Sequence, residues 1–403
     1  MKFIRDPLYE DFIILDNTLL KVVEHPSFQR LRRISQLGLV SYIYPGATHT
    51  RFSHSLGTVY LMDEIIKNLE IKGFKIEEEL KISMKISALV HDIGHGPFSH
   101  ALEFTLLNIK HEELTKLILK NVLKDIIGDE ICNNVIKILS GEFEKKFVNE
   151  LISSQLDVDR LDYIRRDAFY CGVHYGLIDV SRILKTITIT DDNKLAIEEK
   201  GKHAVEGYLV ARYLMYWSVY FHKTNLSLQA MLYSLFKRAR DLIEEKCDIP
   251  LIENLRILIE DGVKSERGLK AFLNLDDSDM FYLFKIWTNS KDRIISDLSR
   301  RILNREIFKV YDEELSIEDI EEIKDNLIKE GLDPKYYLIE KVAIDTAYEP
   351  YNLDGESSIK VILKNGKIVE ISQALPTDTL KALSRPIKKK LIFTPFRKSH
   401  QSA

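Results

Sequence analysis

The chain has 403 residues, 45% of them hydrophobic and 30% charged, which predicts a folded globular protein rather than a disordered one. The 58 lysines and arginines nearly balance the 62 aspartates and glutamates, and the formal net charge is −4. This balance argues against a protein that coats nucleic acid, whereas a small anionic substrate needs only a local group of cations.

Cysteine spacing and hydropathy argue against several further classes of protein. Cys132, Cys171 and Cys247 are far apart and show no CxxC spacing, so we expect free thiols rather than a disulfide framework or a zinc knuckle. The charged N-terminal segment lacks the apolar run of a secretory signal, and no window of about 18 uncharged apolar residues predicts a membrane span. These features predict a cytoplasmic protein with no membrane partner.

The hydrophobic pattern predicts a mainly α fold, since apolar residues recur at helical spacing while glycine and proline are scarce. In chain order, an extended arm or short hairpin over residues 1–20 leads into a helix that ends near Pro26. Helices are then predicted over 27–37, 53–71, 77–92, 98–110, 111–126, 129–140, 145–166 and 204–246.

Strands are predicted in two places. Alternating β-branched residues predict a β-hairpin near 185–200, inserted between helices, and Asn365-Gly366 predicts a second hairpin turn. Residues 250–335 are highly charged and have a helical pattern. We therefore expect a helical core over 1–335 with the inserted hairpin, followed by a C-terminal α+β lobe and basic tail over 336–403.

Four side chains form a mixed nitrogen and oxygen set suited to a divalent metal: His54, His91, Asp92 and Asp159. Glycines follow His91 and Asp92 in HDIGHGPFSH (91–100), and at such a helix end two adjacent residues can share one ion. Taken alone, His54 could cap a helix or lie on the surface, and Asp159 could be solvated. The combination favours a metal site.

The helix that carries Asp159 adds a second pattern. Asp159, Tyr163 and Asp167 are four residues apart and therefore line one helix face. Two acids and a phenol are an unusual choice for a core. Instead of contributing to a site, these three residues could form an exposed stripe whose acids pair with Arg160 and Arg166.

Three motifs together carry a family resemblance: RFSHSLG (51–57), HDIGHGPFSH (91–100) and DVDRLDYIRRD (157–167). They resemble the HD-superfamily deoxynucleoside triphosphate triphosphohydrolases, most closely the branch that joins this domain to a sterile-alpha-motif domain. Bacterial dGTP triphosphohydrolases are more distant relatives. The resemblance begins near residue 6, continues through YFHK (220–223) and reaches the C-terminal lobe. It implies an HD-domain helical core with a small C-terminal lobe.

The resemblance also implies roles for individual residues. One divalent ion (iron, manganese, zinc or magnesium) would be bound by His54, His91, Asp92 and Asp159. The catalytic residues would be His95, His100 and His111 around the α-phosphate, together with Glu103, which would orient His100. His100 would act as a general acid or handle the nucleophile. Glu103 stands where the family has an aspartate, so its carboxylate has a longer reach.

Substrate contacts are implied in the same way. Phosphates would meet Arg51, Arg160, Tyr163 and Arg212. The sugar would meet Gln36, Leu37 and Asp167, and Tyr220 would contact the sugar or the base. Arg160 replaces a family lysine, which keeps the charge but changes the geometry. Tyr216 replaces a pocket histidine, so base preference stays open.

Relatives in this family also bind activator nucleotides between subunits, and the matching positions here are Lys2, Glu24, Arg32 and Lys223. Glu24 stands where an aspartate reads guanine, whereas Arg5 replaces a small amide. The resemblance therefore implies a homo-oligomer, dimer or tetramer, with a nucleotide activator as a further partner.

The sequence thus predicts a metal-dependent enzyme that hydrolyses a deoxynucleoside triphosphate, with dGTP as one candidate, to deoxynucleoside and triphosphate. Two other functions stay open. One is a 5′-nucleotidase or phosphodiesterase on the same scaffold. The other is a nucleotide-sensing or nucleic-acid-binding module with little turnover, which would use the basic and aromatic tail 384–403.

Overall fold

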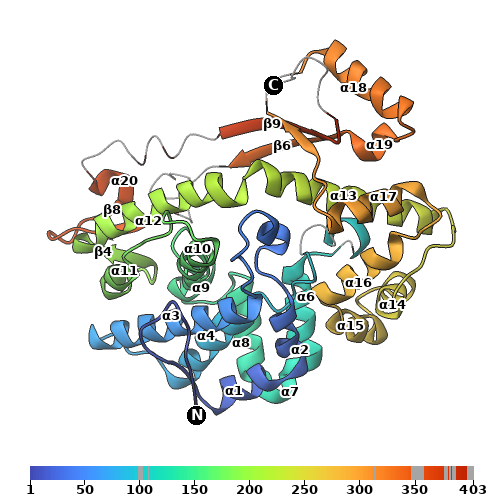
Figure 1. Cartoon of the computed structure of the whole chain (residues 1–403). Coiled ribbons are helices and arrows are strands. Elements are labelled where there is room, and N and C mark those ends of the chain that lie inside the picture. Colours follow the sequence, from blue (N-terminus) through green and yellow to red (C-terminus); the bar gives the residue numbers. More distant parts are fainter. Residues whose placement is uncertain are drawn as a thin grey trace.

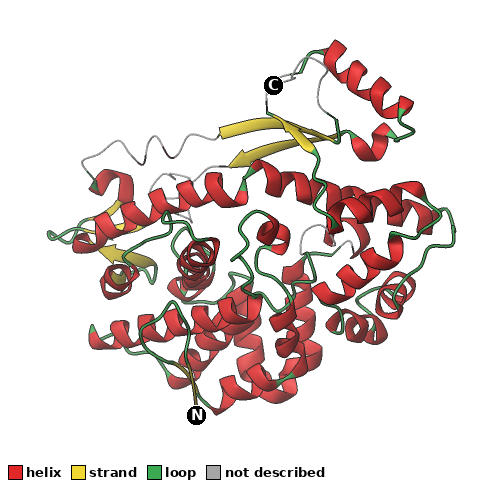
Figure 2. Cartoon of the chain, in the orientation of Figure 1, coloured by secondary structure: helices red, strands yellow, loops and turns green. Residues whose placement is uncertain are grey.

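The computed structural model describes residues 1–98, 103–107, 109–312, 315–345, 358–375, 380, 383 and 387–396. Helices dominate these residues, and strands form three small sheets, which confirms the predicted mainly α fold (Figures 1 and 2). The N-terminal arm is the predicted hairpin, in which β1 (Lys2–Ile4) pairs antiparallel with β2 (Ile13–Leu15).

The segment after the hairpin turns more tightly than its spacing predicts. Helix α1 (Asn17–Glu24) is capped by Asp16, and α2 (Pro26–Gln29) continues as a 3-10 turn, Arg30–Arg33. The predicted helix over 27–37 is therefore wrong in its second half. The backbone becomes extended at Ile34, and Ser35 bridges to Thr50 in place of another helical turn.

A layer of helices that carries the candidate site lies largely in the lower half of Figure 1. Helix α3 (Arg51–Ile71) packs against α4 (Glu78–Val90) and α10 (Val158–Cys171). Between α4 and α10 the described residues form α6 (His111–Ile118), a π-helix at Leu119–Leu123, α7 (Lys124–Ile127), α8 (Asp129–Leu139) and α9 (Lys146–Ile152). The described part of the predicted helix 98–110 contains a π-turn, Glu103–Leu107.

The single helix predicted over 145–166 is two helices. Asp157 ends the linker between α9 and α10: its Oδ1 accepts from the backbone NH of Arg160 (2.8 Å) and its Oδ2 from that of Ser154 (2.9 Å). An aspartate that satisfies free NH groups in this way starts a helix. The break places Asp159 in the first turn of α10.

The hairpin predicted near 185–200 is present as β3 (Ile187–Ile189) and β4 (Leu195–Glu198), after α11 (Val180–Thr186). Strand β4 also pairs in parallel with β7 (Lys360–Ile362), which pairs antiparallel with β8 (Ile368–Glu370), so one four-stranded sheet contains both hairpins. Gly366 in the second hairpin turn has φ +81°, as the Asn-Gly pair predicts. The domain boundary near 335 stays a prediction.

The long helix predicted over 204–246 is interrupted once. Helix α12 (Lys202–Met215) passes into a π-turn (Tyr216–Tyr220), and α13 (Lys223–Glu244) begins after His222. The imidazole of His222 accepts from the backbone NH of Thr224 (3.2 Å) and so acts as the N-cap.

The rest of the described chain follows α13 in the sequence. Four helices follow it, namely α14 (Glu253–Asp261), α15 (Glu266–Leu273), α16 (Asp277–Trp287) and α17 (Arg293–Leu303). A second sheet, in the order β5-β9-β6, joins β5 (Lys309–Tyr311), β6 (Ile339–Asp345) and β9 (Ile387–Thr394). Three short or peripheral helices complete the described chain: α18 (Ile317–Lys329), α19 (Pro334–Tyr337) and α20 (Ile371–Ala374).

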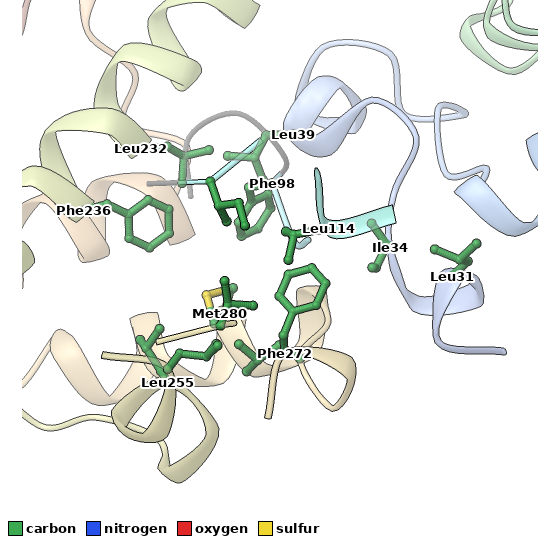
Figure 3. Close-up of a cluster of buried hydrophobic side chains, with 14 of the residues drawn as sticks. Leu31, Ile34, Leu39, Phe98, Leu114, Leu232, Phe236, Leu255, Phe272 and Met280 are labelled. Atoms are coloured by element: carbon green, nitrogen blue, oxygen red, sulfur yellow. The ribbon is translucent and has the colours of Figure 1, made fainter. Parts of the chain in front are cut away.

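A buried hydrophobic cluster joins the HDIGHGP segment to the C-terminal helices (Figure 3). Phe98, the ring at its centre, stacks on Phe284 of α16 with ring centroids 5.8 Å apart. Arg30 crosses the same region, and its Nη2 donates to the carbonyls of Ile93 (2.7 Å) and His95 (2.8 Å). These contacts hold the segment after α4 in a fixed position.

Helices α3 and α10 approach closely because α3 carries a glycine at the crossing. A Cβ atom on Gly57 would lie 1.9 Å from Oδ1 of Asp162 and 2.5 Å from Nη2 of Arg166. Only glycine leaves room for these two side chains, which are buried between the helices.

We predict that Gly57→Ala lowers the free energy of unfolding by about 3 kcal/mol, because the added methyl group overlaps the Asp162 carboxylate in a packed interior. Urea unfolding of both proteins measures the difference. Gly207→Ala is the matched control, since a Cβ on that helical glycine of α12 meets no atom within 4 Å. The control should gain about 0.5–1 kcal/mol; equal effects of the two variants would contradict the close approach.

Candidate metal centre

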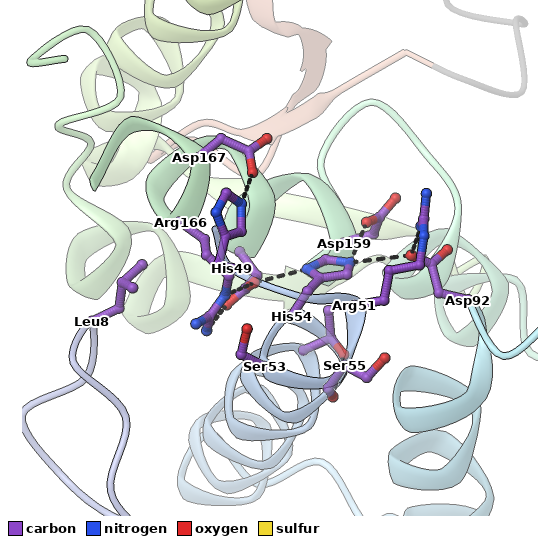
Figure 4. A network of polar contacts seen from close by, with 12 residues as sticks. Leu8, His49, Arg51, Ser53, His54, Ser55, Asp92, Asp159, Arg166 and Asp167 are labelled. Atoms are coloured by element: carbon purple, nitrogen blue, oxygen red, sulfur yellow. Dashed lines mark hydrogen bonds and ion pairs between the residues drawn. The ribbon is translucent and has the colours of Figure 1, made fainter. Parts of the chain in front are cut away.

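The four side chains of the predicted metal set converge, and Figure 4 shows three of them, His54, Asp92 and Asp159. Nε2 of His54 lies 3.0 Å from Oδ1 of Asp159 and 3.2 Å from Nε2 of His91, which is itself 3.5 Å from the same Asp159 oxygen. Asp92 joins from the side, with Oδ2 3.9 Å from His54 and Oδ1 3.5 Å from His91. These residues come from α3, the end of α4 and the first turn of α10.

This spacing fits a divalent ion. Ligand atoms at about 2.0–2.2 Å from a common ion lie roughly 3–3.5 Å from one another, and imidazole nitrogens with carboxylate oxygens suit several divalent metals. His54, His91 and Asp159 each offer one ligand atom within 4.8 Å of the others. Asp92 is less centred, because Arg51 forms an ion pair with its Oδ2.

The outer nitrogen of each histidine is already engaged. Nδ1 of His91 donates to the carbonyl of Ala88 (2.8 Å), and Nδ1 of His54 lies 2.8 Å from Oδ2 of Asp162. A hydrogen on Nδ1 leaves the lone pair on Nε2, so both rings present their ligating nitrogen to the centre.

Asp162 and its neighbours form a buried network that the sequence analysis missed. Arg166 donates to Asp162 through Nε (2.8 Å) and Nη2 (2.9 Å), and its Nη1 donates to Asp6 (2.9 Å). The Tyr9 hydroxyl donates to Asp162 as well, at 2.5 Å. The i, i+4 spacing of Asp162 and Arg166 in DVDRLDYIRRD was the available sequence signal.

Charge at the centre favours a cation. Burial alone lowers the pKa of His54, but the carboxylates of Asp159 and Asp162 outweigh burial and raise its pKa to about 10. Burial opposes ionisation of Asp159 too, yet hydrogen bonds from His54 and His91 hold the pKa of that carboxyl well below its ordinary value. Without an ion, the His54 ring therefore holds a proton between ionised carboxylates, and a bound metal would replace that proton on Nε2.

Two of the predicted catalytic histidines lie beside this centre. The rings of His95 and His111 stack with centroids 3.8 Å apart, and Nε2 of His95 is 3.4 Å from Oδ1 of Asp92. Gly94 permits this arrangement, since a Cβ there would lie 2.1 Å from the carbonyl oxygen of His111. His100 and the side chain of Glu103 lie outside the described residues.

The face of α10 predicted from spacing turns inward and is not an exposed stripe: Asp167 is buried, and Asp159 and Tyr163 are half-buried. Asp167 accepts from the Tyr220 hydroxyl through Oδ2 (2.6 Å), while its Oδ1 lies 2.7 Å from Nε2 of His49. The ring of Tyr163 meets that of Tyr220 edge-on, with centroids 5.9 Å apart. Sequence reasoning did not single out His49, which occurs in an otherwise unremarked loop.

Gln36 and Leu37 reach the same region from the N-terminal segment. The backbone NH of Gln36 donates to the carbonyl of His49 (3.1 Å), and its side-chain Oε1 is buried with no hydrogen-bond partner in the described part of the chain. Leu37 packs against the neighbouring hydrophobic cluster. The predicted sugar-contacting residues are thus brought together through His49.

The predicted phosphate-contacting arginines differ in their partners. Arg51 pairs with Asp92, and Arg160 pairs with Asp157. Arg212 donates from Nη1 to the amide oxygen of Gln155 (2.7 Å). The Arg212 guanidinium also lies 5.7 Å from the ring centroid of Tyr216.

The four positions expected to bind an activator lie on the N-terminal hairpin, its flanking helices and α13. Lys2 and Glu24 are exposed and 3.9 Å apart, Arg32 lies 3.6 Å from the ring centroid of Phe52, and Nζ of Lys223 is 2.7 Å from Asp312.

A helical core with a two-histidine, two-carboxylate centre between α3, α4 and α10 defines the class: a metal-binding hydrolase of the HD type. The HD domain family matches residues 51–167, which contain all four residues of the metal set, and the HD-associated region matches residues 178–249.

Known proteins similar to this chain extend the match beyond the motif. A solved phosphohydrolase from Bacteroides thetaiotaomicron is 37% identical, with a TM-score of 0.90 over 98% of this chain and 99% of that one. The uncharacterised protein YwfO of Bacillus subtilis is 35% identical over 92% of this chain and 87% of its own length. The human deoxynucleoside triphosphate triphosphohydrolase SAMHD1 is 30% identical over 60% of this chain and 45% of its own length.

The chain therefore belongs to the HD superfamily of phosphohydrolases and is of the SAMHD1-like kind. Helices of the length and apolarity needed to cross a membrane do not occur in the described part of the chain.

Titration of His54 gives a test of the charge arrangement. Because its folded-state pKa of about 10 exceeds the ordinary 6.5, its stabilising contribution is complete below pH 6.5 and is lost as the pH rises through 10. We predict that chelator-treated protein loses roughly 3 kcal/mol of unfolding free energy between pH 7 and pH 10 through this group. Urea unfolding across this range checks the value. His54→Gln should have a flatter profile, and an unchanged slope would contradict the assignment.

Proposed function

We propose that this protein hydrolyses deoxynucleoside triphosphates to deoxynucleoside and triphosphate. The observation that carries the proposal is the convergence of His54, His91 and Asp159, with Asp92 at their side, next to a group of arginines and tyrosines on α10 and α12. Similarity to a dNTP triphosphohydrolase supports this substrate class over monophosphates or cyclic dinucleotides.

His54, His91, Asp92 and Asp159 would hold one divalent ion, and their donor set suits iron, manganese, zinc or magnesium alike. Such an ion supplies Lewis acidity toward a phosphoryl oxygen and lowers the pKa of bound water. Asp162 and the Ala88 carbonyl orient the two imidazoles for this task.

The arginines and histidines of the chain would offset the phosphate charge and supply the proton that the reaction needs. Arg51, Arg160 and Arg212 offset phosphate charge as water adds to the α-phosphorus and the bond to the 5′-oxygen breaks. The departing 5′-oxygen takes a proton, and triphosphate leaves as the second product. His95 and His111 lie beside the Asp92 carboxylate, where an imidazole can supply this proton. The role of His100 as the general acid, with Glu103 orienting it, stays a prediction from the family resemblance.

The nucleoside would lie against the buried face of α10. Asp167 is held on one oxygen by Tyr220 and lies against His49 on the other, so its position is suited to a sugar hydroxyl. Gln36 and Leu37 would border the sugar, and Tyr216 the base. The arrangement leaves base preference open, with dGTP as a reasonable first substrate.

We also propose a homo-oligomer with an activator nucleotide bound near Lys2, Glu24, Arg32 and Lys223. The exposed charges of Lys2 and Glu24 at the N-terminal hairpin support a site on this surface.

Incubation with dGTP and Mn²⁺, followed by separation of the products, tests the reaction. We predict release of deoxyguanosine and intact triphosphate. Asp159→Asn should lower the rate at least about 100-fold, because it removes one ligand oxygen and one charge from the centre. Asp191→Asn, the same change in the exposed turn of the inserted hairpin, is the control and should leave the rate unchanged. Release of orthophosphate or pyrophosphate would reject this chemistry.

Asp162→Asn tests whether the hydrogen bond from His54 to Asp162 contributes to metal binding. The amide keeps the size of the side chain but weakens its hydrogen bond to His54, so we predict a 10- to 100-fold loss of metal affinity. Titration of the apoprotein with Mn²⁺ by calorimetry gives the affinity without any activity assay. An affinity equal to wild type would show that Asp162 only stabilises the fold through Arg166.

A further inference from the structure

Residues 153–157, the linker between α9 and α10, hold two arginines of the site in two different ways. Arg160 forms an ion pair with Asp157, so a carboxylate of the linker itself offsets its charge. Arg212, from α12, meets the linker at Gln155, whose side-chain oxygen is 2.7 Å from Nη1. A neutral amide holds the second arginine.

Arg212 is a buried cation without a counter-charge in the described part of the chain. Its residue surface is only 6% exposed, and its Nε is buried with no hydrogen-bond partner among the described residues. The neighbouring groups that act most strongly on its pKa, after burial, are Tyr208, Tyr163, Arg160 and Tyr216, none of them an acid. Burying a cation in this way is costly unless an anion joins it.

Gln155 is itself held in place. Its backbone carbonyl accepts from the Tyr208 hydroxyl (2.8 Å), one turn before Arg212 on α12. The linker is fixed at its far end by Asp157, which accepts from the backbone of Ser154 and Arg160. The Gln155 amide is therefore a rigid acceptor that orients Arg212 and leaves its full charge uncompensated.

We propose that Gln155 is a positioning residue that holds Arg212 through a neutral acceptor, so that the guanidinium charge stays available to the outer phosphates of the substrate and favours triphosphates over shorter phosphate chains. The inference rests on the proposed function, because phosphate contact by Arg212 is part of it. A carboxylate at position 155 would offset the charge of Arg212 with an ion pair inside the protein, as Asp157 does for Arg160.

The decisive comparison is Gln155→Glu against Gln155→Met. The glutamate has nearly the same shape and gives Arg212 a stronger partner, so a purely structural role predicts that Gln155→Glu is the milder change. The proposed role predicts the opposite order, because the new ion pair competes with the phosphate. Gln229→Glu, the same change on the exposed surface of α13, is the control.

Affinity for inorganic triphosphate, measured by calorimetry on the metal-loaded protein, is the first readout. We expect Gln155→Glu to weaken binding about 10- to 100-fold, Gln155→Met to weaken it less, and Gln229→Glu to match wild type. Inorganic phosphate should distinguish the variants far less than triphosphate. With dGTP as substrate, KM should rise in Gln155→Glu much more than kcat falls, and thermal unfolding should show all three variants folded.

The outcomes separate this inference from the proposed function. If dGTP is not hydrolysed but Gln155→Glu still weakens triphosphate binding, the proposed reaction fails and the role of Gln155 stands. If wild type does not bind triphosphate, or if Gln155→Glu binds it as well as wild type or better than Gln155→Met, the role of Gln155 is overturned.

Discussion

The carboxylate of Asp162 connects the parts of this molecule that must meet for the site to exist. It accepts from Tyr9 in the N-terminal arm and from Arg166 on its own helix, and it bonds His54 on α3. A buried carboxylate with this many partners stays ionised and keeps a fixed orientation, and the pKa of Asp162 lies well below its ordinary value despite burial. Gly57 provides the space for Asp162 where α3 and α10 cross. The orientation of His54 therefore depends on the same close approach of the two helices.

Charge is divided across the site in a way that suits a phosphorylated substrate. Carboxylates surround the two imidazoles where α3, the end of α4 and the first turn of α10 meet, and arginines lie on the neighbouring turns of α10 and α12. An ion at the first group and phosphates at the second would each meet opposite charge. Without ligands, internal pairs such as Arg51 with Asp92 satisfy part of this charge. Because Arg212 has no such acidic partner in the described chain, it is the cation best placed to gain from an anion.

The family similarity extends well beyond the motif that defines it. The HD domain match ends at residue 167, whereas the structural similarity to the Bacteroides phosphohydrolase covers 98% of the chain. Arg212, Tyr216 and Tyr220 lie beyond the HD match but within the HD-associated region, and they complete the site from α12 and the π-turn after it. Under the proposed function the two regions would share the contacts to substrate, while the four residues of the metal set all lie in the first.

The sequence by itself determined the helical class, helices α3 and α4, both hairpins and the set of four metal-site residues. Helical periodicity, turn chemistry and the dense histidine motif at 91–100 are local patterns, whereas His54 and Asp159 are distant in the chain and were joined to that motif by the family resemblance. Side-chain periodicity also placed Asp159, Tyr163 and Asp167 on one face of α10.

Only the tertiary structure decided the break at residues 153–157, the early end of the helix after Pro26 and the contacts of Asp162, His49 and Gln155. Each depends on a contact between distant segments, such as Gln155 with Arg212 or His49 with Asp167. Hydrophobic periodicity reports which face of an element is buried, but it carries no information about which polar partner from another helix meets that face.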